Sequence, residues 1–117
     1  MQYALLIYGD EKSWESAEED ERRAMYAEHE RFMTMLQNRG AIRGGAELAS
    51  TGTAKTVRHR ADDLSVTDGP FAETAEQFGG FYLIEAADMD EALELAKELP
   101  AAVVEVRPLV PAPESGS

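Results

Sequence analysis

The chain contains no cysteine, and this absence excludes disulfide bonds and thiolate-ligated metal sites. Basic residues are also scarce, since 11 Lys and Arg face 23 Asp and Glu and leave a formal net charge of −12. Binding to a nucleic-acid backbone requires clustered positive charge, so we predict no nucleic-acid partner. The short basic stretch of Arg58, His59 and Arg60 is more typical of a solvated strand face.

Long apolar runs are missing as well. No segment approaches the roughly 20 apolar residues that a membrane-spanning helix needs. The first residues lead straight into a strand-like segment, without the basic and apolar regions of a signal peptide. We therefore predict no membrane contact and a cytoplasmic location.

Signatures of bound metals and cofactors are equally scarce. The chain has only two histidines, His29 and His59, and its many carboxylates show no metal-ligand spacing. Neither a dinucleotide fingerprint, nor a phosphate-binding loop, nor a nucleophilic serine motif occurs. We predict no metal and no cofactor, which leaves cofactor-free acid–base chemistry as the leading enzymatic hypothesis.

What is present is typical of one folded domain. Of the 117 residues, 44% are hydrophobic and 29% are charged, a composition that supports a single core and argues against general disorder. We predict a single domain over residues 1–108. Prolines at 108, 111 and 113 and the final Glu-Ser-Gly-Ser predict a disordered tail over residues 109–117.

The spacing of apolar residues predicts two helices. The first should begin at a capping box formed by Ser16 and Glu19 and end at Gly40, with Trp14 in the linker before it. The second should begin at Asp88 and stop before Pro100. Strands are expected at residues 3–8, 42–49, 54–60, 64–67, 78–86 and 103–106.

This order of elements predicts an α+β fold of the ferredoxin-like split βαβ type, with an extra hairpin in the middle. Both helices should cover one face of a mainly antiparallel sheet. The first strand, residues 3–8, is apolar at every position and so calls for cover on both faces. A second copy of the chain, packed sheet against sheet, would supply the missing cover, so we predict a homodimer.

Most of the unusual local chemistry lies in residues 66–85, which read VTDGPFAETAEQFGGFYLIE. This stretch resembles the signature of the DGPF family within the YCII-related proteins. Residues 3–8, His29 with Phe32, residues 56–58 and residues 104–108 also match, so the resemblance covers nearly the whole chain except the tail. This chain departs from the family in having Ala75 where the family usually has Lys, and Ala61-Asp62 in place of an Asp-Gly turn.

The resemblance implies a ferredoxin-like subunit that forms a dimeric α+β barrel. It also implies a cleft in which His29 and Asp68 form a catalytic pair. Relatives with this architecture include isomerases, monooxygenases and a dehydrochlorinase that act on small molecules. DGPF proteins often accompany extracytoplasmic-function sigma factors in genomes, which makes association with a sigma factor a further implication of the resemblance.

His29 is the first candidate site residue, because it interrupts the apolar stripe of the first helix. It can be a structural histidine bonded to a backbone carbonyl, or a base whose imidazole titrates near neutral pH. Asp68 can form a local turn before Gly69-Pro70, or it can orient the imidazole as a carboxylate orients a catalytic histidine.

Five further residues form the predicted ligand-binding set: Gly69, Pro70, Phe71, Glu73 and Gln77. Each also has a plain structural interpretation. Gly69 would serve backbone geometry, Phe71 would pin the loop to the core, and Glu73 and Gln77 would keep an exposed loop soluble. Tyr8 and Tyr82 can either pack in the core or reach the cleft.

Together these patterns predict a small-molecule-binding protein whose substrate the sequence does not name. As an enzyme it would be a cofactor-free isomerase, lyase or hydrolase, with His29 as base and Asp68 as its orienting group. The alternative is a non-catalytic regulatory or sensor module acting with a sigma factor, which the missing Lys at position 75 favours.

Overall fold

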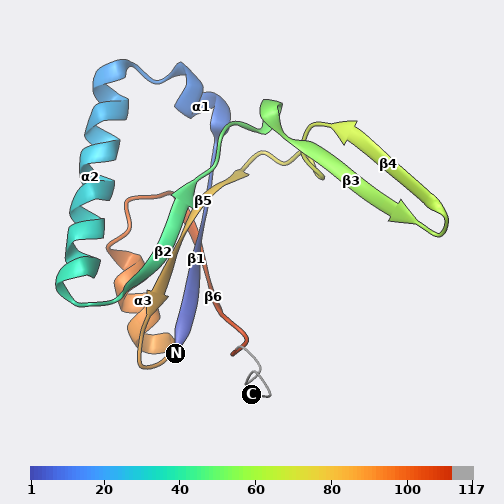
Figure 1. Cartoon of the computed structure of the whole chain (residues 1–117). Coiled ribbons are helices and arrows are strands. Elements are labelled where there is room, and N and C mark those ends of the chain that lie inside the picture. Colours follow the sequence, from blue (N-terminus) through green and yellow to red (C-terminus); the bar gives the residue numbers. More distant parts are fainter. Residues whose placement is uncertain (112–117) are drawn as a thin grey trace.

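A computed structural model of the chain describes residues 1–111 (Figure 1). In chain order its elements are β1 (Gln2–Gly9), α1 (Glu11–Ser16), α2 (Glu19–Asn38), β2 (Ile42–Glu47), the short 3₁₀ helix η1 (Thr51–Thr53), β3 (Lys55–Arg60), β4 (Asp63–Asp68), β5 (Gln77–Glu85), α3 (Met89–Lys97) and β6 (Val103–Pro108).

Four of the strands form one antiparallel sheet with the order β2-β5-β1-β6, and α2 and α3 lie on the same side of it (Figure 1). This is the strand order of the ferredoxin-like fold, so the predicted fold class is confirmed. Among the strands of residues 1–111, the remaining two, β3 and β4, pair only with each other and form the predicted extra hairpin.

The core lies between the sheet and its two long helices. Because side chains alternate along a strand, every second residue of β1 and β5 faces the helices. Leu5 of β1, Ile84 of β5 and Leu36 of α2 are fully enclosed there. The other buried residues are Tyr3, Phe32, Ala41, Ala86, Ala92, Leu95 and Leu99.

The opposite face of the sheet is also apolar. Ala4 and Leu6 alternate with the buried Tyr3 and Leu5, and they pair across the ladder with Leu83 and Phe81. All four side chains therefore share the face that points away from α2 and α3, and all four are only partly buried. This open face is the one for which the sequence predicts a covering second copy, and the homodimer stays a prediction.

The predicted start of the first helix is wrong. Residues 11–38 form two helices, and the first is capped by Asp10, whose carboxylate accepts from the backbone N–H of Lys12 at 3.0 Å and Ser13 at 3.4 Å. Extended residues Ala17 and Glu18 then separate α1 from α2, and no side chain caps α2. Trp14 consequently lies in a helix rather than a linker.

Among residues 1–111, no helix combines the length and the apolar character that crossing a membrane requires. Of the predicted tail, residues 109–111 form neither helix nor strand, and Leu109 donates its N–H to the Gln2 carbonyl at 2.9 Å. The rest of that prediction, residues 112–117, lies outside the described residues.

The predicted cap of α3 is confirmed, and it carries a stability prediction. Asp88 accepts from the N–H of Glu91 at 2.9 Å, while the Glu91 carboxylate accepts from the N–H of Ala87 at 3.2 Å. We expect Asp88→Ala to lower the free energy of unfolding by about 1 kcal/mol, because one helix N–H loses its partner. Urea unfolding measures the loss. Asp90→Asn, in the same turn but without a capping bond, should cost less than half as much.

Candidate functional site

His29 lies on α2 at the margin of the core. The apolar stripe of this helix runs from Met25, which is 36% exposed, to Phe32 and Leu36, which are 3% and 0% exposed. His29 falls between these extremes and is half-buried. One side of its imidazole therefore faces the core, and a polar partner is needed there.

Tyr82 of β5 is that partner. Its hydroxyl lies 2.9 Å from Nδ1 of His29, and the two rings stack with 6.1 Å between their centroids. The Tyr82 ring also packs against the Phe32 ring in a T-shaped arrangement, with 5.1 Å between the ring centroids. The Tyr82 ring thus packs against the core while its hydroxyl contacts the candidate base, and its access to a cleft stays a prediction.

A second polar pair lies close to the first. The hydroxyl of Tyr26, on α2, donates to both carboxylate oxygens of Glu47 at 3.1 and 3.2 Å. The Trp14 and Tyr26 rings pack in a T-shaped arrangement with 5.4 Å between their centroids, and this contact holds α1 beside the two polar pairs. We call His29, Tyr82, Tyr26 and Glu47 the His29 cluster.

The sequence interpretation missed Tyr26 and Glu47. Tyr26 had a usable signal, because it precedes His29 by three residues and so lies on the same side of the helix. Glu47 had none, because its place depends on how β2 aligns with β5. That alignment contains an irregularity between Ile42 and Gly44.

The surroundings favour the neutral imidazole. Burial lowers the pKa of His29, while the negative charges of Glu47 and Glu28 and a hydrogen bond to the backbone of Pro100 act in the opposite direction. Burial, reinforced by Glu47, raises the pKa of Tyr82. With the phenol protonated and the imidazole neutral, Nδ1 accepts the phenolic proton in the tautomer that carries its hydrogen on Nε2, and this tautomer is suited to passing a proton between the two.

The lowered pKa of His29 makes stability depend on pH. The His29 side chain of the unfolded chain takes up a proton near pH 6.5, whereas that of the folded chain takes it up only at lower pH. The free energy of unfolding is therefore highest above pH 6.5, and this contribution is lost as the pH falls through the folded pKa. We expect wild type to lose more stability than His29→Gln between pH 7.5 and 5. Urea unfolding at both pH values measures this, and equal losses would contradict it.

Asp68 lies elsewhere, at the end of β4. Its carboxylate pairs with Lys55 across the hairpin, and its side chain is 87% exposed. In the described residues of one chain, His29 bonds to Tyr82 and Asp68 to Lys55, and no hydrogen bond joins the two predicted catalytic groups. The His29–Asp68 pair stays a prediction.

The predicted ligand-binding residues lie between this hairpin and β5. Gly69 has a positive φ of 95°, a conformation that favours glycine, and its N–H bonds to Ala54 at 2.8 Å. Phe71 is 78% exposed, with the Arg58 guanidinium 5.9 Å from its ring centroid, so it does not pin the loop to the core. Gln77 begins β5 and donates to the Thr74 carbonyl at 2.6 Å.

Pro70 is partly buried and Glu73 is exposed. The segment that holds Glu73 consists of bends rather than a helical turn, so Glu73 and Gln77 are not neighbours on a helix face. The five predicted residues therefore share one short stretch of chain in which Phe71 and Glu73 are exposed and the others are partly buried, and their role in binding a ligand stays a prediction.

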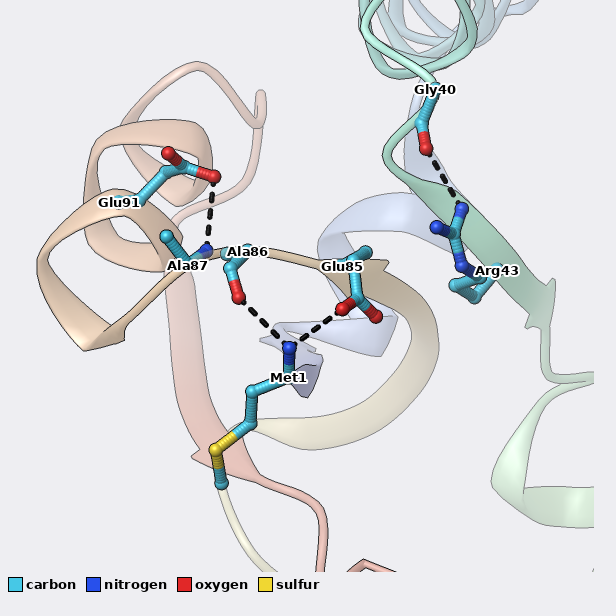
Figure 2. A network of polar contacts seen from close by, with 7 residues as sticks. All are labelled: Met1, Gly40, Arg43, Glu85, Ala86, Ala87 and Glu91. Carbon is cyan, nitrogen blue, oxygen red and sulfur yellow. Dashed lines mark hydrogen bonds and ion pairs between the residues drawn. The ribbon is translucent and has the colours of Figure 1, made fainter.

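Two hollows in the described residues are lined by none of these residues. The larger, about 530 Å³, is lined by residues that include Met1, Arg39, Glu85 and Glu91, at the end of the sheet remote from the β3–β4 hairpin (Figure 1). Figure 2 shows the contacts there, in which the Met1 ammonium bonds to Glu85 at 2.6 Å and to the Ala86 carbonyl at 3.2 Å. The smaller, about 360 Å³, is lined by Ala27, Glu30, Arg31 and Thr34 of α2.

Comparison with known proteins identifies the family. The YCII-related domain matches residues 1–112. The chain is also 44% identical over 119 residues to "Uncharacterized protein R00369" of Rhizobium meliloti (strain 1021), an alignment that covers 93% of this chain and 92% of that protein. A match over nearly the full length, on a ferredoxin-like fold, establishes that this chain belongs to the YCII-related family.

Proposed function

We propose that this protein binds a small molecule and catalyses a cofactor-free proton transfer, with His29 as the base. The observation that carries the proposal is the 2.9 Å contact between Nδ1 of His29 and the Tyr82 hydroxyl. A half-buried imidazole with a lowered pKa is neutral at neutral pH and can accept a proton. Isomerisation, elimination and hydrolysis are the reaction types that such a base serves.

Tyr82 is the group that touches the substrate in this proposal. Its phenol oxygen takes a proton from the substrate while its own proton moves to Nδ1 of His29, which becomes an imidazolium. The charge of Glu47 favours that imidazolium. Return of the proton to another substrate atom completes an isomerisation, and its delivery to a leaving group completes an elimination. Each proton taken is given back, so no cofactor is needed.

The DGPF-type loop supplies the rest of the proposed site. Asp68, Gly69, Pro70, Phe71, Glu73 and Gln77 follow one another along a stretch that is exposed at Asp68, Phe71 and Glu73, where a ligand can meet it. Asp68 would orient or stabilise the charged imidazole once ligand is bound. The motif at residues 68–71 supports placement in the DGPF branch, and a chain without cysteine suits the reducing cytoplasm.

We propose a homodimer as the working unit. The support is the open face of the sheet, where Ala4, Leu6, Phe81 and Leu83 form an apolar surface that neither α2 nor α3 covers. A second copy seated there would remove these side chains from water. Association with a sigma factor as a sensor module stays an expectation from the family resemblance.

Deuterium exchange tests the proposed chemistry without knowledge of the product. A panel of small carbonyl and aromatic compounds is incubated with the protein in D₂O, and their proton signals are followed by NMR. A substrate should lose signal at one carbon position at a rate proportional to protein concentration. Binding of a compound without exchange at any position would favour a non-catalytic module and count against the proposal.

A further inference from the structure

The β3–β4 hairpin, residues 55–68, stands apart from the body of the protein. Its two strands pair with each other from Lys55↔Asp68 to Arg60↔Asp63 and with no strand of the main sheet. In Figure 1 the hairpin projects beyond the sheet, and neither α2 nor α3 lies against it. A two-stranded hairpin is marginally stable alone in water, so an extended one calls for a packing partner. We call residues 55–68 the arm.

One face of the arm, which we call its apolar face, carries three aliphatic side chains. Val57 pairs with Val66 and His59 with Leu64, so these side chains share that face by the alternation of the strands, with the Lys55–Asp68 ion pair at its base. Val57 is 53% exposed, Leu64 62% and Val66 60%. The other face carries Thr56, Arg58, Ser65 and Thr67 and is polar. Three aliphatic side chains aligned on a projecting ribbon are typical of a surface that another molecule covers.

The position of the arm indicates which molecule that is. In Figure 1 the arm extends to the side of the sheet opposite α2 and α3, which is the side of the open face. The arm and the open face thus border the same space. A second copy seated on the open face would meet the arm, and the two apolar surfaces would form one continuous interface.

Charge also favours a second copy of this chain. Within the arm, Lys55, Arg58 and Arg60 balance Asp62, Asp63 and Asp68, so the remaining residues carry the whole net charge of −12. Strand β3 itself holds three cations and no carboxylate. An arm without net charge is not repelled by the acidic body of another copy, whereas two bodies alone repel each other.

From these observations we propose that the arm clasps a second copy of the chain, with Val57, Leu64 and Val66 packed against the body seated on the open face. This inference rests on the proposed homodimer and adds a second contact to it. By two-fold symmetry each copy gives one arm and receives one. The arm then holds the dimer together rather than merely connecting β2 to β5.

Spin labels test the clasp directly, because the cysteine-free chain accepts a single label at any chosen position. Leu64→Cys places the label on the apolar face and Ser65→Cys places it on the polar face of the same strand. At concentrations where the protein is dimeric, the label at 64 should be immobilised and the label at 65 mobile. Dilution into the monomer range should release the label at 64. Equal mobility of both labels in the dimer would overturn the clasp.

Sedimentation separates this inference from the homodimer. Leu64→Ser with Val66→Ser should weaken dimerisation by at least about tenfold, whereas Ser65→Ala with Thr67→Ala should leave it unchanged. Both pairs of changes lie on the exposed arm, and circular dichroism checks that the body stays folded. If the apolar-face variant dimerises as tightly as wild type, the clasp is wrong and the homodimer stands. If wild type is monomeric at all concentrations, both proposals fail.

Discussion

Replacing His29 by alanine is expected to slow deuterium exchange on a bound substrate by about 10²–10⁴-fold, the usual contribution of a positioned acid–base group. The alanine variant keeps the Tyr82 phenol, whose pKa is raised by burial and by Glu47, but removes the acceptor for its proton. Exchange measured at saturating substrate isolates the loss of chemistry from a loss of binding. His59→Ala, on the arm and outside the His29 cluster, should exchange at the wild-type rate at concentrations where the variant is dimeric.

Tyr82→Phe is the matched variant for the relay. It retains the ring, whose centroid lies 5.1 Å from that of Phe32, and loses only the hydroxyl that bonds to His29. If the proton passes through the phenol, this variant loses about as much rate as His29→Ala, and the double variant loses no more than either. Full activity in Tyr82→Phe combined with loss in His29→Ala would mean that the imidazole contacts the substrate itself.

The fold could be predicted because its elements carry local signals. The short, continuously apolar run of residues 3–8, the helical stripe that ends at Leu36, and the Asp88 cap each specify an element without reference to distant residues. The start of the first helix was predicted wrongly because two capping signals compete. Asp10 has a carboxylate that reaches two backbone N–H groups, and Ser16, the predicted cap, became the last residue of α1 instead.

The candidate site was predictable in part. His29 drew attention as a polar residue on an apolar stripe, and Tyr82 shares the helix-facing side of β5 with Ile84 because strand side chains alternate. Their contact joins residues 53 positions apart, which no local pattern specifies. The pairing of Asp68 with Lys55 likewise depends on the register of the hairpin, and the sequence offers no signal for where the arm points.

Gly45→Ala is expected to lower the free energy of unfolding by about 3 kcal/mol, through overpacking and backbone strain together. A Cβ at this position would lie 2.6 Å from the Phe81 carbonyl oxygen and 3.2 Å from Cα of Tyr82, and the backbone φ of 152° is one that side chains rarely adopt. Gly79→Ala is the matched control, because its Cβ would meet no atom within 4 Å. We expect the control to change stability by no more than about 0.5 kcal/mol in urea unfolding.

The same substitution tests how β2 and β5 together position the site. Gly45 lies opposite Tyr82 in the ladder, and Glu47 follows two residues later on the same strand face. Relief of the clash must move β2 away from β5, and this motion carries Glu47 away from Tyr82 and His29. Because Glu47 opposes the burial effect on His29, the pKa of His29 should fall further in Gly45→Ala, as measured by NMR titration. A destabilised variant with an unchanged pKa of His29 would show that Glu47 does not act on the imidazole through this pair of strands.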